Sequence, residues 1–369
     1  MKSIDHKKTT LLEIVPYTEA HRDEVLSLVN LSLGEKQILK RDAAYWHWKH
    51  EENPFGRSLM LVGLQEGKVV GMRAFLRWQL NWQGERIEAA KPVDSVTHPQ
   101  ARRQGVFSQL TTAACDMAQQ MGIQILFNTP NQNSLPGYLK LGWQQVGLVP
   151  SLVKVTSPAT ASWKLLKSLI SSKHFKQEIP TSDWFISDPT DTSQLFGEGD
   201  KFEEAFENLL LKSNSLNKNS SEHILTDKTI SFWRWRYMGH PHYQYYVERC
   251  YDGAELTGVL FYRLNVRRGL REVMITDIVT NPEKKNVVKK LIAQLSEQVR
   301  SDYFVSLATK SHETFNELRA SRFRIVPRKG LQLVARSLVD QGDSEGFDFN
   351  NDIYQFDRWS LSLGDLEGL

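Results

Sequence analysis

The sequence predicts an α/β (α+β) protein built from two tandem units of one fold, each a mostly antiparallel mixed sheet flanked by helices. Three observations lead to this prediction. The chain has 369 residues, a length that suits two or three domains. Its two halves contain matched sequence blocks in the same order. Each half also alternates β-rich runs with segments of helical periodicity.

The internal repeat is carried by three matched blocks. The first is a W-x-W motif followed by a basic residue, the second is a glycine, and the third reads VDSVTHP in one half and ITDIVTNP in the other. The blocks lie at 46–49 and 233–236, at Gly71 and Gly258, and around Asp94 and Asp277. Because they recur in order, with shifts of 187, 187 and 183 residues, we interpret the chain as a tandem duplication. The W-x-W tryptophans are expected to lie in the core of each unit.

The first unit shows its elements most clearly. Residues 58–97 are β-rich, with turns at Glu66-Gly67 and Gln83-Gly84. The other expected elements are helices over 21–33, 105–122 and 131–143 and strands over 123–130 and 144–155. The predicted organisation is a unit at 1–155, a linker rich in Ser, Thr, Pro and Asp at 156–200, a second, degenerate unit at 201–339, and an acidic tail at 340–369.

Charge is unevenly distributed along the chain. The tail carries eight acidic residues and one basic residue, Arg358, so its net charge is −7 and that of the remaining chain is +10. A basic body suits an anionic ligand such as a nucleotide cofactor, but also nucleic acid. The tail also holds large apolar residues such as Trp359, which favours docking on the body over a solvated segment.

Composition narrows the class of protein. No apolar run approaches the roughly 18 residues of a membrane-spanning helix, and the polar start MKSIDHKKTT has no apolar signal region. The two cysteines, Cys115 and Cys250, are far apart, which excludes a disulfide scaffold and a zinc site built on CxxC pairs. We therefore expect a cytoplasmic protein with no membrane partner and no metal.

The segment THPQARRQGVFSQL carries the clearest candidate site. It places Arg102, Arg103, Gln104 and Gly105 between a strand and a helix. A glycine there permits positive φ and close approach of a ligand. The free N–H groups at the helix start, together with the two arginines, form an anion site that suits a pyrophosphate. An ordinary basic turn is the alternative.

With these residues in view, the chain resembles the GNAT family of acyl-CoA-dependent N-acyltransferases, and its tandem-GNAT branch in particular. The family loop R/Q-x-x-G-x-G/A is matched by Arg102 and Gly105, with Phe107 in place of a small residue. A second family motif, N-x-x-A-x-x-L-Y-x-K-x-G-F, is matched at 131–143, where Asn131 and Tyr138 are identical and Gly137 and Pro136 depart from it.

The resemblance implies direct transfer of an acyl group from acetyl-CoA or another acyl-CoA to a small amine such as an amino sugar. Tyr138 would be the acid that protonates the leaving thiolate, and Asp94 is the candidate base. The cofactor-binding residues would be Ser95, Val96 and Thr97 along the pantetheine arm, Arg102, Arg103, Gln104, Gly105, Val106, Phe107 and Ser108 at the pyrophosphate, and Asn131.

Several alternatives stay open. Asp277, the counterpart of Asp94, belongs to a unit whose loop NPEKKNVV is two residues shorter and lacks both glycine and arginine, so the aspartate also suits a structural role. For the same reason the second unit is expected to bind no CoA. The protein could also be a non-catalytic acyl-CoA-binding regulator. Nucleic-acid binding is disfavoured because the sequence shows neither an aromatic-basic RNA-binding motif nor a helix-turn-helix signature.

Overall fold

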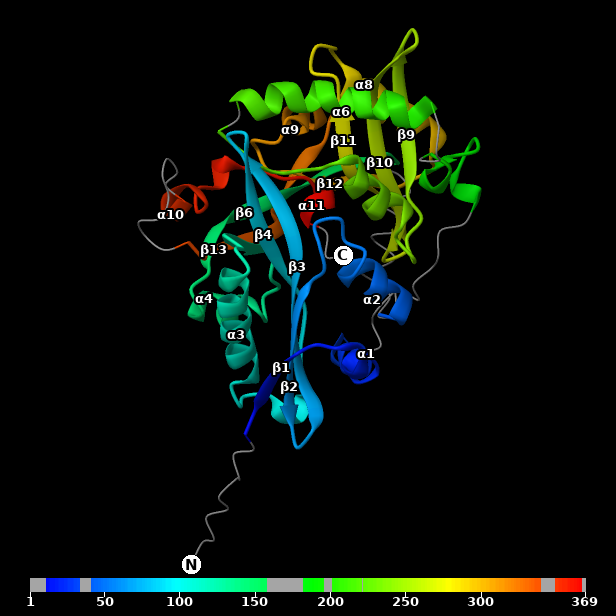
Figure 1. Cartoon of the computed structure of the whole chain (residues 1–369). Coiled ribbons are helices and arrows are strands. Elements are labelled where there is room, and N and C mark those ends of the chain that lie inside the picture. The colour runs from blue at the N-terminus through cyan, green and yellow to red at the C-terminus, as the bar shows by residue number, and fades with distance from the viewer. Residues whose placement is uncertain are drawn as a thin grey trace, which may run out of the picture.

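The computed structural model describes residues 11–33, 41–157, 182–195, 201–220, 222–339 and 349–366. Within these ranges 14 strands join into one mixed sheet flanked by helices. The mixed α/β class agrees with the prediction, and the sheets predicted for the two units are joined into one. Figure 1 shows the N-terminal half (11–157) below the C-terminal half (182–339), with the last helix of the chain between them. None of the helices in the described part of the chain is long and apolar enough to cross a lipid bilayer.

The N-terminal half follows the predicted order of elements. These are β1 (Glu13–Pro16), α1 (Arg22–Leu33), α2 (Ala43–His50), β2 (Leu59–Gln65), β3 (Lys68–Trp82), β4 (Glu85–Thr97), α3 (Val106–Gln120), β5 (Ile125–Asn128), α4 (Leu135–Lys140) and β6 (Gln144–Val155). The predicted turns before β3 and β4 are confirmed, since Gly67 and Gly84 have φ of +73° and +86° in them.

The C-terminal half has a counterpart for each of these elements. In chain order its helices and strands are β7 (Thr190–Asp191), α6 (Lys201–Ser220), β8 (Ile224–Thr226), α7 (Ile230–Trp233) with the π-helical turn η5 (Arg234–Met238), β9 (Tyr246–Asp252), β10 (Glu255–Arg267), β11 (Leu270–Thr280), α8 (Val287–Gln298), β12 (Tyr303–Leu307), α9 (Thr314–Ala320) and β13 (Arg324–Ser337). Among these elements, β8 has no counterpart in the N-terminal half.

The strand order shows that the halves are interlocked. It runs β1-β2-β3-β4-β5-β13-β6-β12-β11-β10-β9-β7, so counterpart strands are met at the same distance from either end. The last strand of each half is exchanged, because β13 pairs antiparallel with β5 and β6 pairs antiparallel with β12. The sheet of each half is therefore completed by the other half.

The W-x-W motifs meet at the contact between the halves. The indole Nε1 of Trp48 donates to the main-chain oxygen of Trp235 at 2.8 Å, and Trp235 Nε1 donates to the Trp48 oxygen at the same distance. The two rings stack with centroids 4.9 Å apart. Trp46, Trp48, Trp233 and Trp235 are all buried, which confirms their predicted place in the core.

Described parts of the predicted linker and of the tail pack on this frame. Residues 182–195 of the predicted linker pack on the C-terminal half, where Trp184 is buried and β7 pairs with β9; residues 158–181 and 196–200 lie outside the described residues. The C-terminal segment 349–366 is docked, as its apolar residues predicted. It contains α10 (Phe349–Asp352), the turn η6 (Phe356–Arg358), β14 (Trp359–Ser360), which pairs with β8, and α11 (Leu363–Leu366).

Candidate active site

The N-terminal half opens where β4 and β5 separate. These parallel strands are paired as far as Ala90 and Leu126. The next residues of β4 are Lys91 and Pro92, and a proline has no N–H with which to continue the ladder. The gap forms a cavity of about 820 Å³. Of the residues predicted for the site, the cavity is lined by Asp94, Ser95, Val96, Thr97, Arg102, Phe107, Asn131 and Tyr138.

A β-bulge shapes the edge of β4 beside the cavity. The register with β3 shifts between Met72 and Ala74, so that Asp94 and Ser95 both lie opposite Arg73. Asp94 has φ of +43°, a left-handed conformation that aspartate adopts more readily than most residues. Arg73 is buried and donates a hydrogen bond to the Ser95 hydroxyl. The bulge therefore directs the Asp94 side chain away from the regular ladder.

Asp94 is held in an ion-pair cluster with residues of α2 and the segment before it. Its Oδ2 lies 2.5 Å from Lys49 Nζ and 3.4 Å from His50 Nε2, and its Oδ1 lies 3.5 Å from Arg41. Burial alone would raise the pKa of Asp94, but Lys49 and Arg41 together hold it well below its usual range. A carboxylate in this setting accepts a proton poorly near neutral pH. These partners could not be predicted, because they come from α2 and the segment before it and not from β4.

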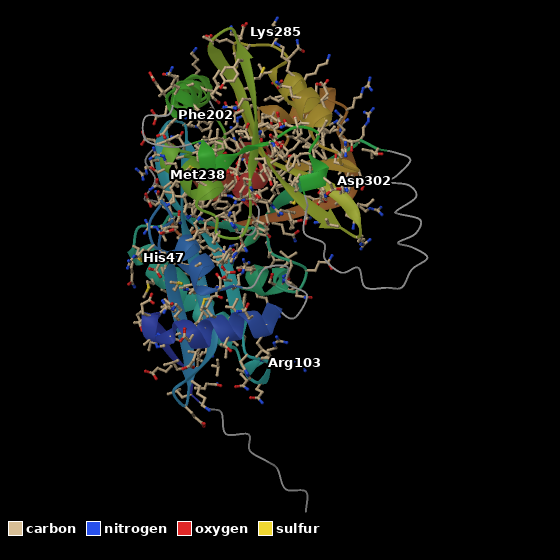
Figure 2. The ribbon with its side chains drawn as sticks, turned by 90° about the vertical axis from the view of Figure 1, so that its right-hand side faces the viewer. His47, Arg103, Phe202, Met238, Lys285 and Asp302 are labelled. Carbon is tan, nitrogen blue, oxygen red and sulfur yellow. The ribbon has the colours of Figure 1, made fainter. Side chains whose placement is uncertain are left out.

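The loop before α3 has the conformation expected of an anion site. Arg103 and Gly105 have φ of +64° and +80°, and Gly105 is the N-cap of α3. The first N–H groups of a helix have no intrahelical acceptor, and the helix dipole makes this end positive. Arg103, Gln104, Gly105 and Ser108 are exposed outside the cavity, and Figure 2 shows Arg103 at the outer edge of the N-terminal half. Val106 is buried against Gly71 and belongs to the core.

The two departures from the family motifs compensate for one another. Phe107, at the start of α3, packs on Gly137 of α4: a Cβ added to Gly137 would lie 2.8 Å from the Phe107 ring. The ring also meets Tyr138 edge-on, with centroids 5.8 Å apart. Pro136 lies in the first turn of α4, where its missing N–H costs no helical hydrogen bond. The bulky residue in the loop motif thus requires the glycine in the second motif.

This pairing predicts that Gly137→Ala destabilises the protein by about 1–3 kcal/mol, because the methyl group overpacks against Phe107. In a Phe107→Leu background the same change should be neutral or stabilising, since alanine favours a helix more than glycine does. A double-mutant cycle from urea unfolding measures the coupling. Equal effects of Gly137→Ala in both backgrounds would contradict the pairing.

Tyr138 and Asn131 occupy the other side of the cavity from β4. Tyr138 is 3% exposed and packs between Phe107 and Trp143. Within the described residues, no group makes a hydrogen bond with its hydroxyl, so the hydroxyl is available to a ligand. The Asn131 side-chain oxygen accepts from the main-chain N–H of Asn133 and Ser134, at 2.9 Å and 3.0 Å, and orders the turn before α4.

Two polar side chains at the closed end of the cavity were not predicted. Lys91 on β4 and Asn128 on β5 both line the cavity and are only 6% and 7% exposed. Lys91 Nζ donates to the main-chain oxygen of Asp365 and lies 4.4 Å from the Trp78 ring centroid. The signal available in the sequence was one lysine within the run of small and apolar residues before Pro92.

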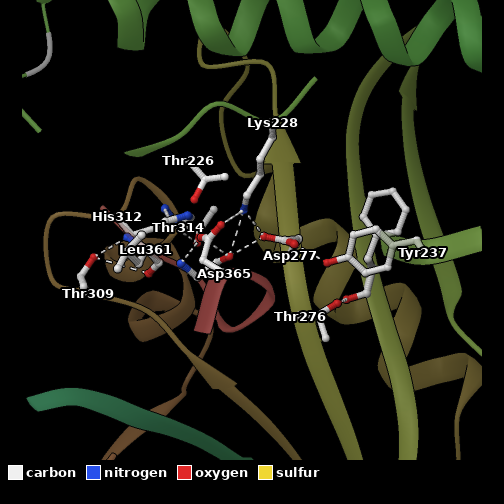
Figure 3. A network of polar contacts seen from close by, with 12 residues as sticks. Thr226, Lys228, Tyr237, Thr276, Asp277, Thr309, His312, Thr314, Leu361 and Asp365 are labelled. Carbon is white, nitrogen blue, oxygen red and sulfur yellow. Dashed lines mark hydrogen bonds and ion pairs between the residues drawn. The ribbon is translucent and has the colours of Figure 1, made fainter. Parts of the chain in front are cut away.

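The counterpart position in the C-terminal half is filled. Lys228 Nζ lies 2.7 Å from Asp277 and 3.1 Å from Asp365, and the Tyr237 hydroxyl donates to Asp277 (Figure 3). Gly364 of α11 packs so closely that an added Cβ would collide with Asp277 and Tyr237. The cavity that remains has a volume of about 100 Å³. Asp365 of the C-terminal segment is thus ion-paired within the C-terminal half.

Within the described residues, no cluster of three His, Cys, Asp or Glu side chains is arranged to hold a metal ion. Cys115 is buried on α3, and burial raises the pKa of its thiol to about 11, which does not suit a nucleophile.

Comparison with known proteins agrees with this architecture. Residues 13–146 match the family model described as Acetyltransferase (GNAT) domain. The search of curated proteins finds no match to this chain. Among solved structures, a GCN5-related N-acetyltransferase from Anabaena variabilis is similar with a TM-score of 0.61 and 16% identity, over 89% of this chain and 73% of that one.

Two further structures show the same fold at low identity. A probable N-acyltransferase of unknown function from Enterococcus faecalis has a TM-score of 0.59 and 13% identity, over 89% of this chain and 73% of that one. The Saccharomyces cerevisiae N-myristoyltransferase with bound myristoyl-CoA has a TM-score of 0.52 and 11% identity, over 90% and 85%. The chain therefore has a GNAT-like fold, and its residues 13–146 match the GNAT acetyltransferase domain model.

Proposed function

We propose that this protein is an acyltransferase that moves an acetyl or other acyl group from acyl-CoA to the primary amine of a small acceptor, such as an amino sugar. The observation that carries the proposal is the cavity between the separated strands β4 and β5 of the GNAT domain, which is bordered by the left-handed loop at Gly105. GNAT-like neighbours described as N-acetyltransferases, and one with bound myristoyl-CoA, support it.

The cofactor would lie along β4. Main-chain groups of residues 95–97, at the end of β4 nearer the loop before α3, are unpaired toward β5 and would bind the pantetheine arm. The loop and first turn of α3, residues 103–108, would bind the diphosphate, with Arg102 adding positive charge from the cavity wall. This placement keeps the adenine end outside and the thioester inside.

The transfer requires a neutral amine and an acid for the leaving group. The amine nitrogen attacks the thioester carbonyl carbon, the carbon–sulfur bond breaks, and the amide forms as its nitrogen releases a proton to water, from which Tyr138 regains the proton that it gives to the thiolate. We assign to Tyr138 the proton that the CoA thiolate takes up, because its hydroxyl lines the cavity without a partner among the described residues. Asp94, already ion-paired with Lys49 and Arg41, is assigned to positioning these cations and not to accepting the amine proton.

We assign no acyl-CoA site to the C-terminal half. Its counterpart cavity is small and filled by α11, and its loop before α8 is two residues shorter. We propose that it instead completes the sheet through β13 and anchors the C-terminal segment. The matched order of elements in both halves supports a place in the tandem-GNAT branch.

The proposal predicts CoA thiol release from acetyl-CoA in the presence of an amine from a panel of amino sugars, polyamines and amino acids. Tyr138→Phe should lower the rate roughly 10²-fold with acetyl-CoA affinity unchanged, because the ring packing is kept and only the acid is lost. Tyr251→Phe, on the exposed edge of β9, is the matched control and should keep full activity.

The outcomes separate the two candidate functions. Acetyl-CoA binding without thiol release for any amine would instead support the non-catalytic acyl-CoA-binding protein. Full activity in Tyr138→Phe would contradict the role assigned to Tyr138.

A further inference from the structure

The proposed function fixes the direction in which the cofactor enters the cavity, and this inference rests on it. With the diphosphate at residues 103–108 and the pantetheine arm at 95–97, the cofactor runs back along β4 toward lower residue numbers. The acyl group then lies past Asp94 on the side of the bulge nearer Lys91. This is the closed end of the cavity, where β4 and β5 come together at Ala90 and Leu126.

The closed end of the cavity holds a lysine, Lys91, that has no ion pair with a carboxylate among the described residues. Lys91 is 6% exposed. Its one described hydrogen bond is to the main-chain oxygen of Asp365, whose carboxylate is paired with Lys228. An ammonium group can donate three hydrogen bonds, so donors remain for a ligand.

A second polar group faces the same space from β5. Asn128 is 7% exposed and lines the cavity, and its Oδ1 makes no hydrogen bond to any described residue. Its amide can donate as well as accept. A long apolar acyl chain would cover Lys91 and Asn128 without satisfying either, which is costly in a buried site.

The charges around Lys91 also favour an anionic ligand. The pKa of Lys91 is lowered to about 7, mainly by burial. The carboxylate of Asp365 on α11 raises it, and the cations Arg236 on η5, Lys49 on α2 and Lys228 before α7 lower it further. A carboxylate placed beside the amine would favour the ammonium form. A ligand carboxylate would thus supply the missing charge.

We propose that the acyl group of the donor carries a carboxylate at its far end, as in a short dicarboxylic acyl-CoA of the succinyl type, and that Lys91 and Asn128 bind this carboxylate. A charge-assisted hydrogen bond in a largely buried site contributes most of the selectivity over an acetyl group.

Calorimetry of the full chain with succinyl-CoA and with acetyl-CoA tests this inference. Succinyl-CoA should bind about tenfold or more tighter. Lys91→Met should remove this difference by weakening succinyl-CoA binding, and circular dichroism and urea unfolding check that the variant is folded. Lys68→Met, at an exposed lysine of β3, is the matched control and should keep the difference. Between about pH 6 and about pH 9 the difference should shrink, because the amine loses its charge.

The calorimetric results distinguish failure of this inference from failure of the proposed function. Equal affinity for the two donors in the unaltered protein overturns this inference and leaves the proposed function standing. A preference for succinyl-CoA that survives in Lys91→Met overturns the assignment to Lys91. Failure to bind either donor overturns the proposed function, and this inference with it.

Discussion

Replacing Lys228 with methionine is expected to destabilise the protein by about 3–5 kcal/mol. Lys228 Nζ is shared by Asp277 and Asp365, whose side chains are only 3% and 2% exposed. Burial would lower the pKa of Lys228, but the two carboxylates raise it, so the ammonium form is held in place. Without it, the two buried carboxylates face one another and lose the cation that they share. The contact between the C-terminal segment and the C-terminal half should be lost first.

The matched control is Lys212→Met. Lys212 pairs with Glu255 at 2.5 Å, but the two side chains are 49% and 35% exposed, and such a surface pair contributes below about 1 kcal/mol. Urea unfolding followed by tryptophan fluorescence measures both variants. Equal losses in the two variants would show that the Lys228 cluster does not anchor the C-terminal segment.

Much of the fold could be predicted because its signals are local. The apolar periodicity of 105–122 and the glycine turns at Gly67 and Gly84 depend on nearby residues alone, and the structure has α3 and the β2–β3–β4 turns at these places. The matched W-x-W blocks also predicted buried tryptophans correctly. Their reciprocal hydrogen bonds across the two halves carry no sequence signal of their own.

The exchange of β6 and β13 could not be predicted. The sequence of a strand specifies which of its faces is apolar, and that pattern is the same whether the strand completes its own sheet or its partner's. The choice depends on the geometry of the segments before each strand. Local pattern therefore predicted the elements and their order, but not the interlocking of the halves.

The candidate site was predictable where its residues belong to local motifs, and not where the fold brings distant residues together. Residues 102–105 and Tyr138 follow from motifs within short stretches of chain. The partners of Asp94 come from α2, and their contact depends on how that helix packs on β4. Lys91 and Asn128 line the same cavity only because β4 and β5, which are distant in sequence, separate beside them. These tertiary contacts are the ones that set the electrostatics of the cavity.

Calorimetry of acetyl-CoA binding to the full chain and to Gly105→Glu tests most directly whether the loop at Gly105 binds the diphosphate of the cofactor. The substitution puts a side chain on a residue with φ of +80° and a negative charge where the diphosphate would bind. Gly67→Glu is the matched control, because Gly67 has φ of +73° in an exposed turn away from the cavity.

We predict one acetyl-CoA site per chain in the unaltered protein, no detectable binding in Gly105→Glu, and unchanged binding in Gly67→Glu. Binding retained by Gly105→Glu, or two equal sites per chain, would contradict the account of where this protein holds its cofactor.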